Sequence, residues 1–132
     1  MAGQAKVIDA SVAFKWFISE TNSNEAVRIR EQHFTNEIVL HAPDIIIYEV
    51  LNALRYRQFA AENIIKAGKD LLDLQIILVK PTETMIKIAA EISVKHNLSV
   101  YDAFYAALAQ DLGTKLLTFD KELLRLPFSE KP

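Results

Sequence analysis

The stretch KVIDASVAF at residues 6–14 joins a short apolar run, an acidic residue and the start of a helical pattern. Residues 6–8 predict a strand, and the spacing of apolar residues from residue 10 to residue 18 predicts a helix directly after it. The same order of a short apolar run and a longer helical segment recurs along the chain, which is typical of a parallel sheet with helices on both faces. We therefore expect an α/β fold, a three-layer α/β/α sandwich with a central parallel sheet of four or five strands.

The remaining elements follow from similar patterns. Further strands are expected over residues 38–40, 76–79 and 115–119, and helices over residues 24–34, 43–58, 60–74, 83–96, 99–112 and 121–126. Pro43 is placed at the first position of its helix, where proline is favoured. Thr82 is expected to cap a helix alone, because Met85 stands where a capping box needs Glu or Gln. Asn97 and Gly113 are expected to end their helices in the left-handed conformation.

Length and composition place the chain among ordinary globular proteins. Its 132 residues predict a single domain over residues 1–132, with 51% hydrophobic and 24% charged residues. The chain has no cysteine, which excludes thiol catalysis, and its net charge of −2 gives no global basic field for polyanions. The amino-terminal segment lacks the apolar run of a signal peptide, and no apolar run reaches the roughly 18 residues of a membrane span. We therefore expect a soluble, cytoplasmic protein that does not associate with membranes.

Two acidic residues follow predicted strands. Asp9 comes directly after the strand at residues 6–8, and Asp120 comes directly after the strand at residues 115–119. Because parallel strands end at one edge of a sheet, these carboxylates are candidates to face each other across a cleft, with Ser11 and Thr118 beside them. Each acid also stands at a helix start, where Asp is a common N-cap, so a purely structural role is the alternative.

Two further acidic residues lie inside predicted helices. Asp102 belongs to a largely apolar helical segment, where a carboxylate is costly unless it is paired, hydrogen-bonded or bound to a metal. The alternative is that Ser99 and Asp102 form a capping box. Glu49 lies at least a turn inside its helix, beyond capping reach, and helix periodicity places Asn52 on the same face. For Glu49 the alternative is a solvated helix face.

Four converging carboxylates would repel one another unless a cation neutralised them. Oxygen ligands favour Mg²⁺ or Mn²⁺ over zinc, and the histidines, which are His33, His41 and His96, lie outside these motifs. A divalent metal among carboxylates is suited to phosphodiester hydrolysis, because it activates water and stabilises the attacked phosphate. Convergence of the four acids would therefore create a hydrolytic metal site.

Four segments resemble the acidic motifs of the PIN domain, in the same order and at similar spacing. They are VIDASV at residues 7–12, YEVLNAL at 48–54, YDAFYAALA at 101–109 and LTFDKEL at 117–123. A single small PIN domain is most similar to the VapC-type toxins of toxin–antitoxin pairs. The resemblance implies a Mg²⁺- or Mn²⁺-dependent endoribonuclease that is dimeric and is held inactive by a cognate antitoxin. It assigns metal binding and catalysis to Asp9, Glu49, Asp102 and Asp120, with Ser11 and Thr118 as polar support.

The surfaces for RNA and protein partners are less well defined by the sequence. Candidates for RNA phosphate contacts are Lys15, Arg55, Arg57, Lys69 and Lys121, although surface cations are commonly only solvated. A mean hydropathy of +0.11 is high for a small monomer and indicates shared apolar surface. Candidates for a homodimer seam or an antitoxin groove, which otherwise belong to the core, are Phe14, Trp16, Phe17, Ile45, Ile46, Leu54, Tyr56 and Phe59.

Other functions fit these residues less well. A phosphoacceptor signalling domain needs adjacent acids after its first strand, whereas Asp9 is followed by Ala10. A haloacid-dehalogenase-like phosphatase needs a second acid where Ser11 stands. A free-standing PIN nuclease of RNA processing and a catalytically silent PIN-fold binding module remain alternatives to a toxin.

Overall fold

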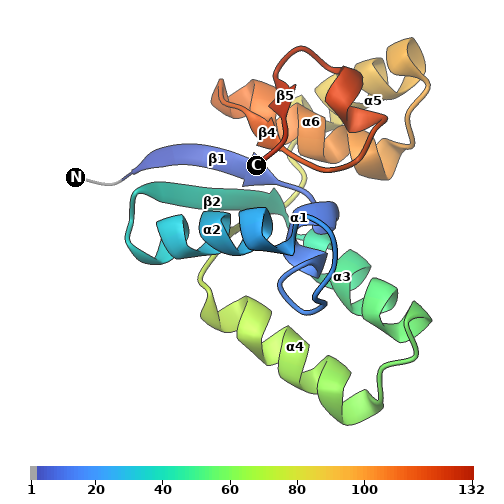
Figure 1. Ribbon diagram of the computed structural model, residues 1–132. Coiled ribbons are helices and arrows are strands. Elements are labelled where there is room, and N and C mark those ends of the chain that lie inside the picture. The colour runs from blue at the N-terminus through green and yellow to red at the C-terminus, as the bar shows by residue number, and fades with distance from the viewer. Residues whose placement is uncertain (1–2) are drawn as a thin grey trace.

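The structure, a computed structural model, describes residues 3–132 and is organised around one parallel sheet (Figure 1). The strands are β1 (Gln4–Ile8), β2 (Ile38–Pro43), β3 (Ile77–Val79), β4 (Leu116–Leu117) and β5 (Ser129–Glu130), in the spatial order β3-β2-β1-β4-β5. Every pair of neighbouring strands is parallel. The predicted parallel sheet is therefore confirmed, with five strands.

Helices flank this sheet and complete the predicted α/β/α sandwich. They are α1 (Ala10–Phe14), α2 (Ser23–Phe34), α3 (Ile45–Tyr56), α4 (Ala61–Asp73), α5 (Glu83–His96) and α6 (Val100–Leu112), followed by a 3₁₀ turn at Leu123–Arg125. α6 packs against β1, β2 and β4 and also against α5, whereas α2 packs against β2. In the view of Figure 1, α5 and α6 lie together above β1 and β2, and α2 and α4 lie below these two strands.

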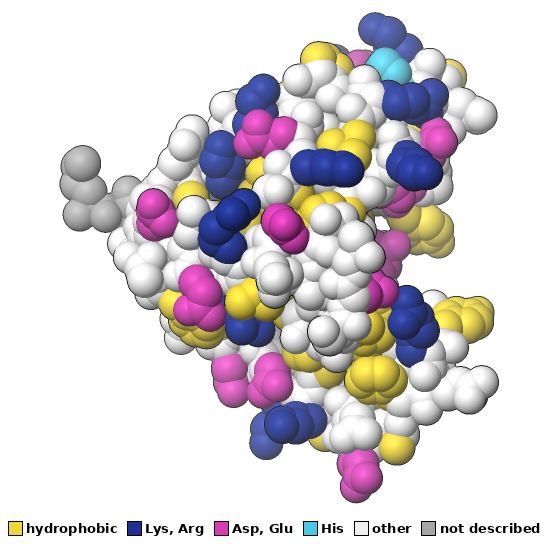
Figure 2. All heavy atoms as spheres, in the orientation of Figure 1, with side chains coloured by type: hydrophobic (Ala, Val, Ile, Leu, Met, Phe, Trp, Pro, Cys, Tyr) yellow, Lys and Arg dark blue, Asp and Glu magenta, His cyan; other side chains and the backbone are white. Residues whose placement is uncertain are grey.

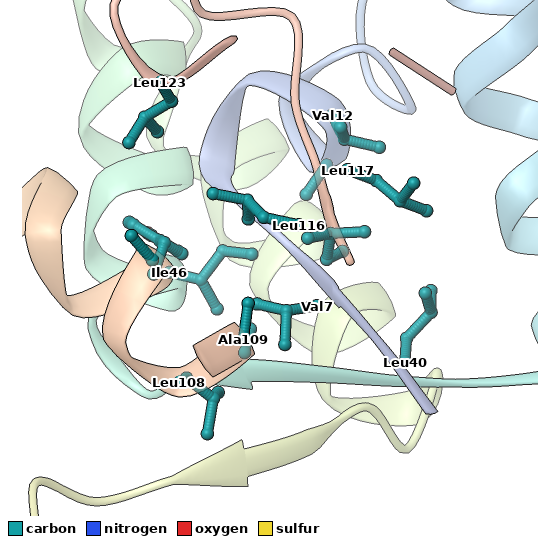
Figure 3. Packing of buried hydrophobic residues seen from close by; sticks show 14 of the residues in the cluster. Val7, Val12, Leu40, Ile46, Leu108, Ala109, Leu116, Leu117 and Leu123 are labelled. Atoms are coloured by element: carbon teal, nitrogen blue, oxygen red, sulfur yellow. The ribbon is translucent and has the colours of Figure 1, made fainter. Parts of the chain in front are cut away.

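The core is formed by the central strands and the apolar face of α6. Val7 of β1, Leu40 of β2 and Leu108 of α6 are at most 1% exposed and belong to one cluster, part of which is drawn in Figure 3. The small side chains of Ala106 and Ala109 are fully buried, which lets α6 approach the sheet closely. α6 is thus fixed against the strands whose ends carry the candidate site.

Pro43 occupies a position different from the expected one. It is the last residue of β2, paired in register with Val79 of β3, and it is not the first residue of α3. α3 begins at Ile45. The residue before it, Asp44, is still bonded to β3, because its N–H donates to the carbonyl oxygen of Val79 at 3.1 Å. Proline lacks only its own N–H donor, so it can end a strand where that donor is not needed.

Several other boundaries also differ from those expected. α1 ends at Phe14 and not near residue 18, because the next three N–H groups bond to carbonyl oxygens three residues back and form tight turns. The strand expected over residues 115–119 is limited to β4, and the helix expected over residues 121–126 is only the 3₁₀ turn. β5 was not predicted, because its two polar residues carry no apolar signal.

Three predicted helix caps are confirmed. The hydroxyl oxygen of Thr82 accepts a hydrogen bond from the N–H of Met85 at 3.1 Å and caps α5 alone. Asn97 ends α5 with φ of 54°, and Gly113 ends α6 with φ of 65°, both in the left-handed region.

The candidate interface residues mostly belong to the core. Ile46 and Leu54 are completely buried, and five others pack against the core while partly buried, namely Phe14, Trp16, Phe17, Ile45 and Phe59. Tyr56 is 81% exposed and is the member of this set that presents most surface. Within residues 3–132, no helix combines the length and apolar character needed to cross a membrane.

Candidate active site

The sheet brings Asp9 and Asp120 to the same edge, as the sequence predicted. β1 and β4 are parallel neighbours in which Ile8 pairs with Leu117, and the N–H of Asp9 donates to the carbonyl oxygen of Leu117. Asp9 follows β1 directly and Asp120 lies just beyond β4. Two residues that are far apart in the sequence thus lie on neighbouring strand ends.

Asp9 is buried and is held by two hydroxyl groups. Only 4% of the residue is exposed. One carboxylate oxygen accepts a hydrogen bond from Ser11 Oγ at 2.6 Å, and the other accepts one from Thr118 Oγ1, also at 2.6 Å. Asp9 stands at the N-cap position of α1, but its side chain makes no capping hydrogen bond. The carboxylate is therefore committed to this polar cluster and not to helix capping.

The environment of Asp9 makes its charged form more costly than it is in the unfolded chain. Burial raises the pKa of its carboxyl group to about 6, and the negative charge of Asp120 adds to the rise, whereas the hydroxyls of Ser11 and Thr118 oppose it. A buried carboxylate with a raised pKa is typical of a site that is completed by a positive charge.

The loop after β4 is tied to this cluster through the backbone. Ser11 Oγ accepts from the N–H of Phe119 at 2.9 Å, and Thr118 Oγ1 accepts from the N–H of Asp120 at 2.9 Å. One carboxylate oxygen of Asp120 accepts from the N–H groups of Glu122 and Leu123. Asp120 therefore caps the following turn and still interacts electrostatically with Asp9, so both roles weighed from the sequence apply.

Asp102 enters the site from the first turn of α6. Ser99 Oγ accepts from the N–H of Asp102 at 3.0 Å, which is the Ser half of the expected capping box. Burial raises the pKa of the Asp102 carboxyl group, and the negative charges of Asp120 and Glu49 raise it further. Asp102 is thus close enough to both acids to feel their charge.

Glu49 reaches the same region from α3. Its Oε1 accepts a hydrogen bond from the hydroxyl of Tyr105, which lies one turn after Asp102 on α6 and is 1% exposed. A carboxylate bonded to a buried hydroxyl is not part of a freely solvated helix face. Burial, and then the adjacent Glu49 carboxylate, raise the pKa of the Tyr105 hydroxyl far above its ordinary value, so this hydroxyl remains a proton donor.

The four acids form one electrostatic cluster without closing on a single point. Asp9 interacts with Asp120, and Asp102 interacts with Asp120 and Glu49. Across residues 3–132, however, no three Asp, Glu, His or Cys side chains already stand close enough together to hold an ion. Figure 2 shows a hollow at the right-hand edge of the molecule with acidic side chains on its wall and hydrophobic ones at its rim. The donor set is carboxylate oxygen, which suits Mg²⁺ or Mn²⁺.

A groove of about 620 Å³ runs beside Glu49 between α3, α4 and the start of α6. Asn52 and Arg55 line it on α3, and Asn52 thus lies where helix periodicity placed it relative to Glu49. Tyr48 and Tyr101 also line it and are 72% and 62% exposed. The groove therefore offers a cation, an amide and two aromatic rings next to a site carboxylate.

The other candidate cations have different surroundings. Lys15 Nζ pairs with Glu20 at 3.0 Å, and Arg57 pairs with the same carboxylate at 3.1 Å. Lys69 and Lys121 are exposed, on α4 and just after Asp120 respectively. Two of the five candidates are thus occupied by an internal ion pair, and Arg55 is the one that lines the groove at Glu49.

Comparison with known proteins shows the family of this chain. A family model of the PIN domain matches residues 6–129. The chain belongs to the PIN-domain family. Ribonuclease VapC3 of Pyrobaculum aerophilum is 33% identical over 124 aligned residues, covering 89% of this chain and 90% of that protein.

Solved structures share the fold of this PIN domain. VapC20 of Mycobacterium tuberculosis, a sarcin-ricin loop cleaving toxin, matches with a TM-score of 0.75 at 19% identity, over 96% of this chain and 99% of that one. VapBC2 of Rickettsia felis, bound to a DNA fragment from their promoter, matches with a TM-score of 0.73 at 12% identity, over 98% of this chain and 99% of that one. Together with VapC3, these matches make the chain a VapC-type PIN protein.

One polar residue of the candidate site was missed by the sequence analysis. Tyr105 was treated as part of an apolar helix, yet its hydroxyl bonds to Glu49 across the site. The available signal was its spacing, because a residue three positions after Asp102 lies on the same helix face.

Proposed function

We propose that this VapC-type PIN domain is a metal-dependent endoribonuclease that hydrolyses phosphodiester bonds of RNA. The observation that carries the proposal is the cluster of four coupled carboxylates at the carboxyl edge of the sheet. We further propose that residues 1–132 form a single nuclease domain, that the protein acts in the cytoplasm, and that it is the toxin of a type II toxin–antitoxin pair. The 33% identity to Ribonuclease VapC3 supports this function.

Mg²⁺ or Mn²⁺ would be held by Asp9, Glu49, Asp102 and Asp120. The raised pKa of Asp9 and of Asp102 supports this assignment, because it reflects buried negative charge that a cation would offset. When bound, the cation supplies an acidified water and charge stabilisation for the attacked phosphate. The chain itself orients the carboxylates, through Ser11 and Thr118 at Asp9 and through backbone N–H groups at Asp120.

Single-stranded RNA is the substrate that fits the groove beside Glu49. Aromatic side chains stack unpaired bases, and a guanidinium group binds phosphate in a bidentate manner. Tyr48, Tyr101 and Arg55 provide these groups, and Asn52 adds an amide for hydrogen bonding. The exposure of both tyrosines supports this placement, because neither ring is used by the core.

We also propose a homodimer and a cognate antitoxin as protein partners. A second pocket, of about 590 Å³, is lined mainly by apolar side chains that include Ile45, Met85, Val100 and Phe104. An apolar pocket open at the surface suits the apolar side chains of a protein partner. The relative from Rickettsia felis was solved as a VapBC2 assembly, which supports an antitoxin partner for this chain.

The deciding experiment is an RNA cleavage assay with the purified protein. A mixed-sequence single-stranded RNA is incubated with Mg²⁺, with Mn²⁺ and with EDTA. We expect cleavage in both metals and none in EDTA. Folded protein that neither cleaves RNA nor binds Mn²⁺ would contradict the nuclease proposal and favour a silent binding module.

Arg55→Ala is expected to raise Kd for single-stranded RNA about 5-fold, which corresponds to about 1 kcal/mol for one exposed ionic contact. The slope of log affinity against log salt concentration should become shallower by about 0.7. Filter binding at several salt concentrations measures both effects. Arg28→Ala is the matched control, because Arg28 is an exposed arginine on α2 outside the groove. Equal effects of the two variants would remove Arg55 from the RNA path.

A further inference from the structure

Three of the four acids are restrained by hydrogen bonds to their side chain or to their backbone. Asp9 is held by two hydroxyls, Asp120 accepts from two backbone N–H groups, and the backbone of Asp102 is fixed by Ser99. Glu49 differs from these residues because it stands in the second turn of α3 and has one more rotatable bond than an aspartate. Its carboxylate needs a restraint that α3 itself does not supply.

Tyr105 supplies that restraint from the facing helix. Its ring is packed in the core and is 1% exposed. Its hydroxyl donates to Glu49 Oε1. The donor is fixed by the packing of α6 against the sheet, so the acceptor is fixed with respect to Asp102 on the same helix.

We propose that Tyr105 is a positioning residue, whose hydroxyl holds Glu49 Oε1 so that Oε2 faces the space shared with Asp102. This inference rests on the proposed metal-dependent function and adds a residue to it. A buried tyrosine with a purely structural role can donate to any hydrogen-bond acceptor. A positioning tyrosine instead holds a metal-binding carboxylate in one orientation. Partners that orient metal ligands typically contribute 10–100-fold to metal affinity.

The test is Tyr105→Phe, assayed by Mn²⁺ binding in electron paramagnetic resonance titrations. Phenylalanine keeps the buried ring and removes only the hydroxyl, so the far-ultraviolet circular dichroism should match that of the wild type. We expect Mn²⁺ affinity to fall about 10-fold or more. Tyr56→Phe is the matched control, because Tyr56 is 81% exposed on α3, and its affinity should equal that of the wild type.

A double-mutant cycle with Glu49→Gln separates positioning from general loosening of the fold. If Tyr105 acts through Glu49, Tyr105→Phe should cause no further loss of Mn²⁺ affinity in the Glu49→Gln background. Wild-type affinity in Tyr105→Phe, or an equal loss in both backgrounds, would overturn the inference. Failure of the wild-type protein to bind Mn²⁺ or cleave RNA would instead overturn the proposed function.

Discussion

Asp102→Asn is expected to lower kcat/KM for RNA cleavage about 10³-fold while leaving the fold intact. Loss of about 4 kcal/mol of transition-state stabilisation, the scale on which a metal site acts, corresponds to such a factor. The substitution keeps the backbone N–H that bonds to Ser99 Oγ, so the start of α6 is preserved. It also removes the negative charge at position 102, which the negative charges of Asp120 and Glu49 make unfavourable. Initial rates with excess Mg²⁺ measure the effect.

Asp111→Asn is the control for this prediction. Asp111 is an exposed carboxylate on the last turn of the same helix, far along α6 from the site. Its substitution should leave kcat/KM within a factor of about 2, as is usual for surface changes. Cleavage by Asp102→Asn at more than a tenth of the wild-type rate would show that this carboxylate is not part of the reacting centre.

Asp9→Asn is expected to stabilise the metal-free protein at neutral pH by about 2 kcal/mol. The rise in the pKa of Asp9 from 3.8 to about 6 corresponds to about 3 kcal/mol, and loss of one of two hydroxyl hydrogen bonds offsets about 1 kcal/mol. Because the pKa is higher in the folded chain than in the unfolded chain, the carboxyl group supports folding fully below pH 3.8. That support is lost as the pH rises through 6.

Urea denaturation in EDTA at pH 4 and pH 7.5 measures this difference. Between pH 4 and pH 7.5, the free energy of unfolding of the wild type should fall relative to that of Asp9→Asn. Mn²⁺ added in place of EDTA should restore it in the wild type but not in Asp9→Asn. Asp111→Asn should follow the wild type at both pH values, because that carboxylate is exposed. A variant less stable than the wild type at pH 7.5 would mean that the hydroxyl bonds of Asp9 outweigh its burial.

The arrangement of the strands was largely readable from the sequence, because buried parallel strands leave short apolar runs. That rule located β1 and β3 and identified the strand ends that carry Asp9 and Asp120. It did not locate β5, whose two residues pair only through the backbone. Pro43 was misplaced because a local helix preference gave no information about its pairing with Val79.

The candidate site shows the same division between local and long-range information. The placement of Asp9 and Asp120 at one edge followed from the strand ends, whereas a shared site with Glu49 and Asp102 was implied by the resemblance to the PIN domain. The hydrogen bond between Tyr105 and Glu49 joins residues 56 positions apart, and the ion pair between Arg57 and Glu20 joins residues 37 positions apart. Such contacts depend on how distant segments pack together, and the sequence pattern of one segment cannot specify them.

The position of Thr118 has a consequence for the time at which the site forms during synthesis. Its hydroxyl holds Asp9, although the two residues are 109 positions apart. At roughly 5–20 residues per second, the ribosome makes Thr118 roughly 5–20 seconds after Asp9. Throughout that interval the nascent chain lacks both β4 and Asp120, so the carboxylate cluster is incomplete. A chain truncated before Thr118 therefore leaves the ribosome without an assembled centre, and the carboxylate cluster is complete only after Asp120 has been made.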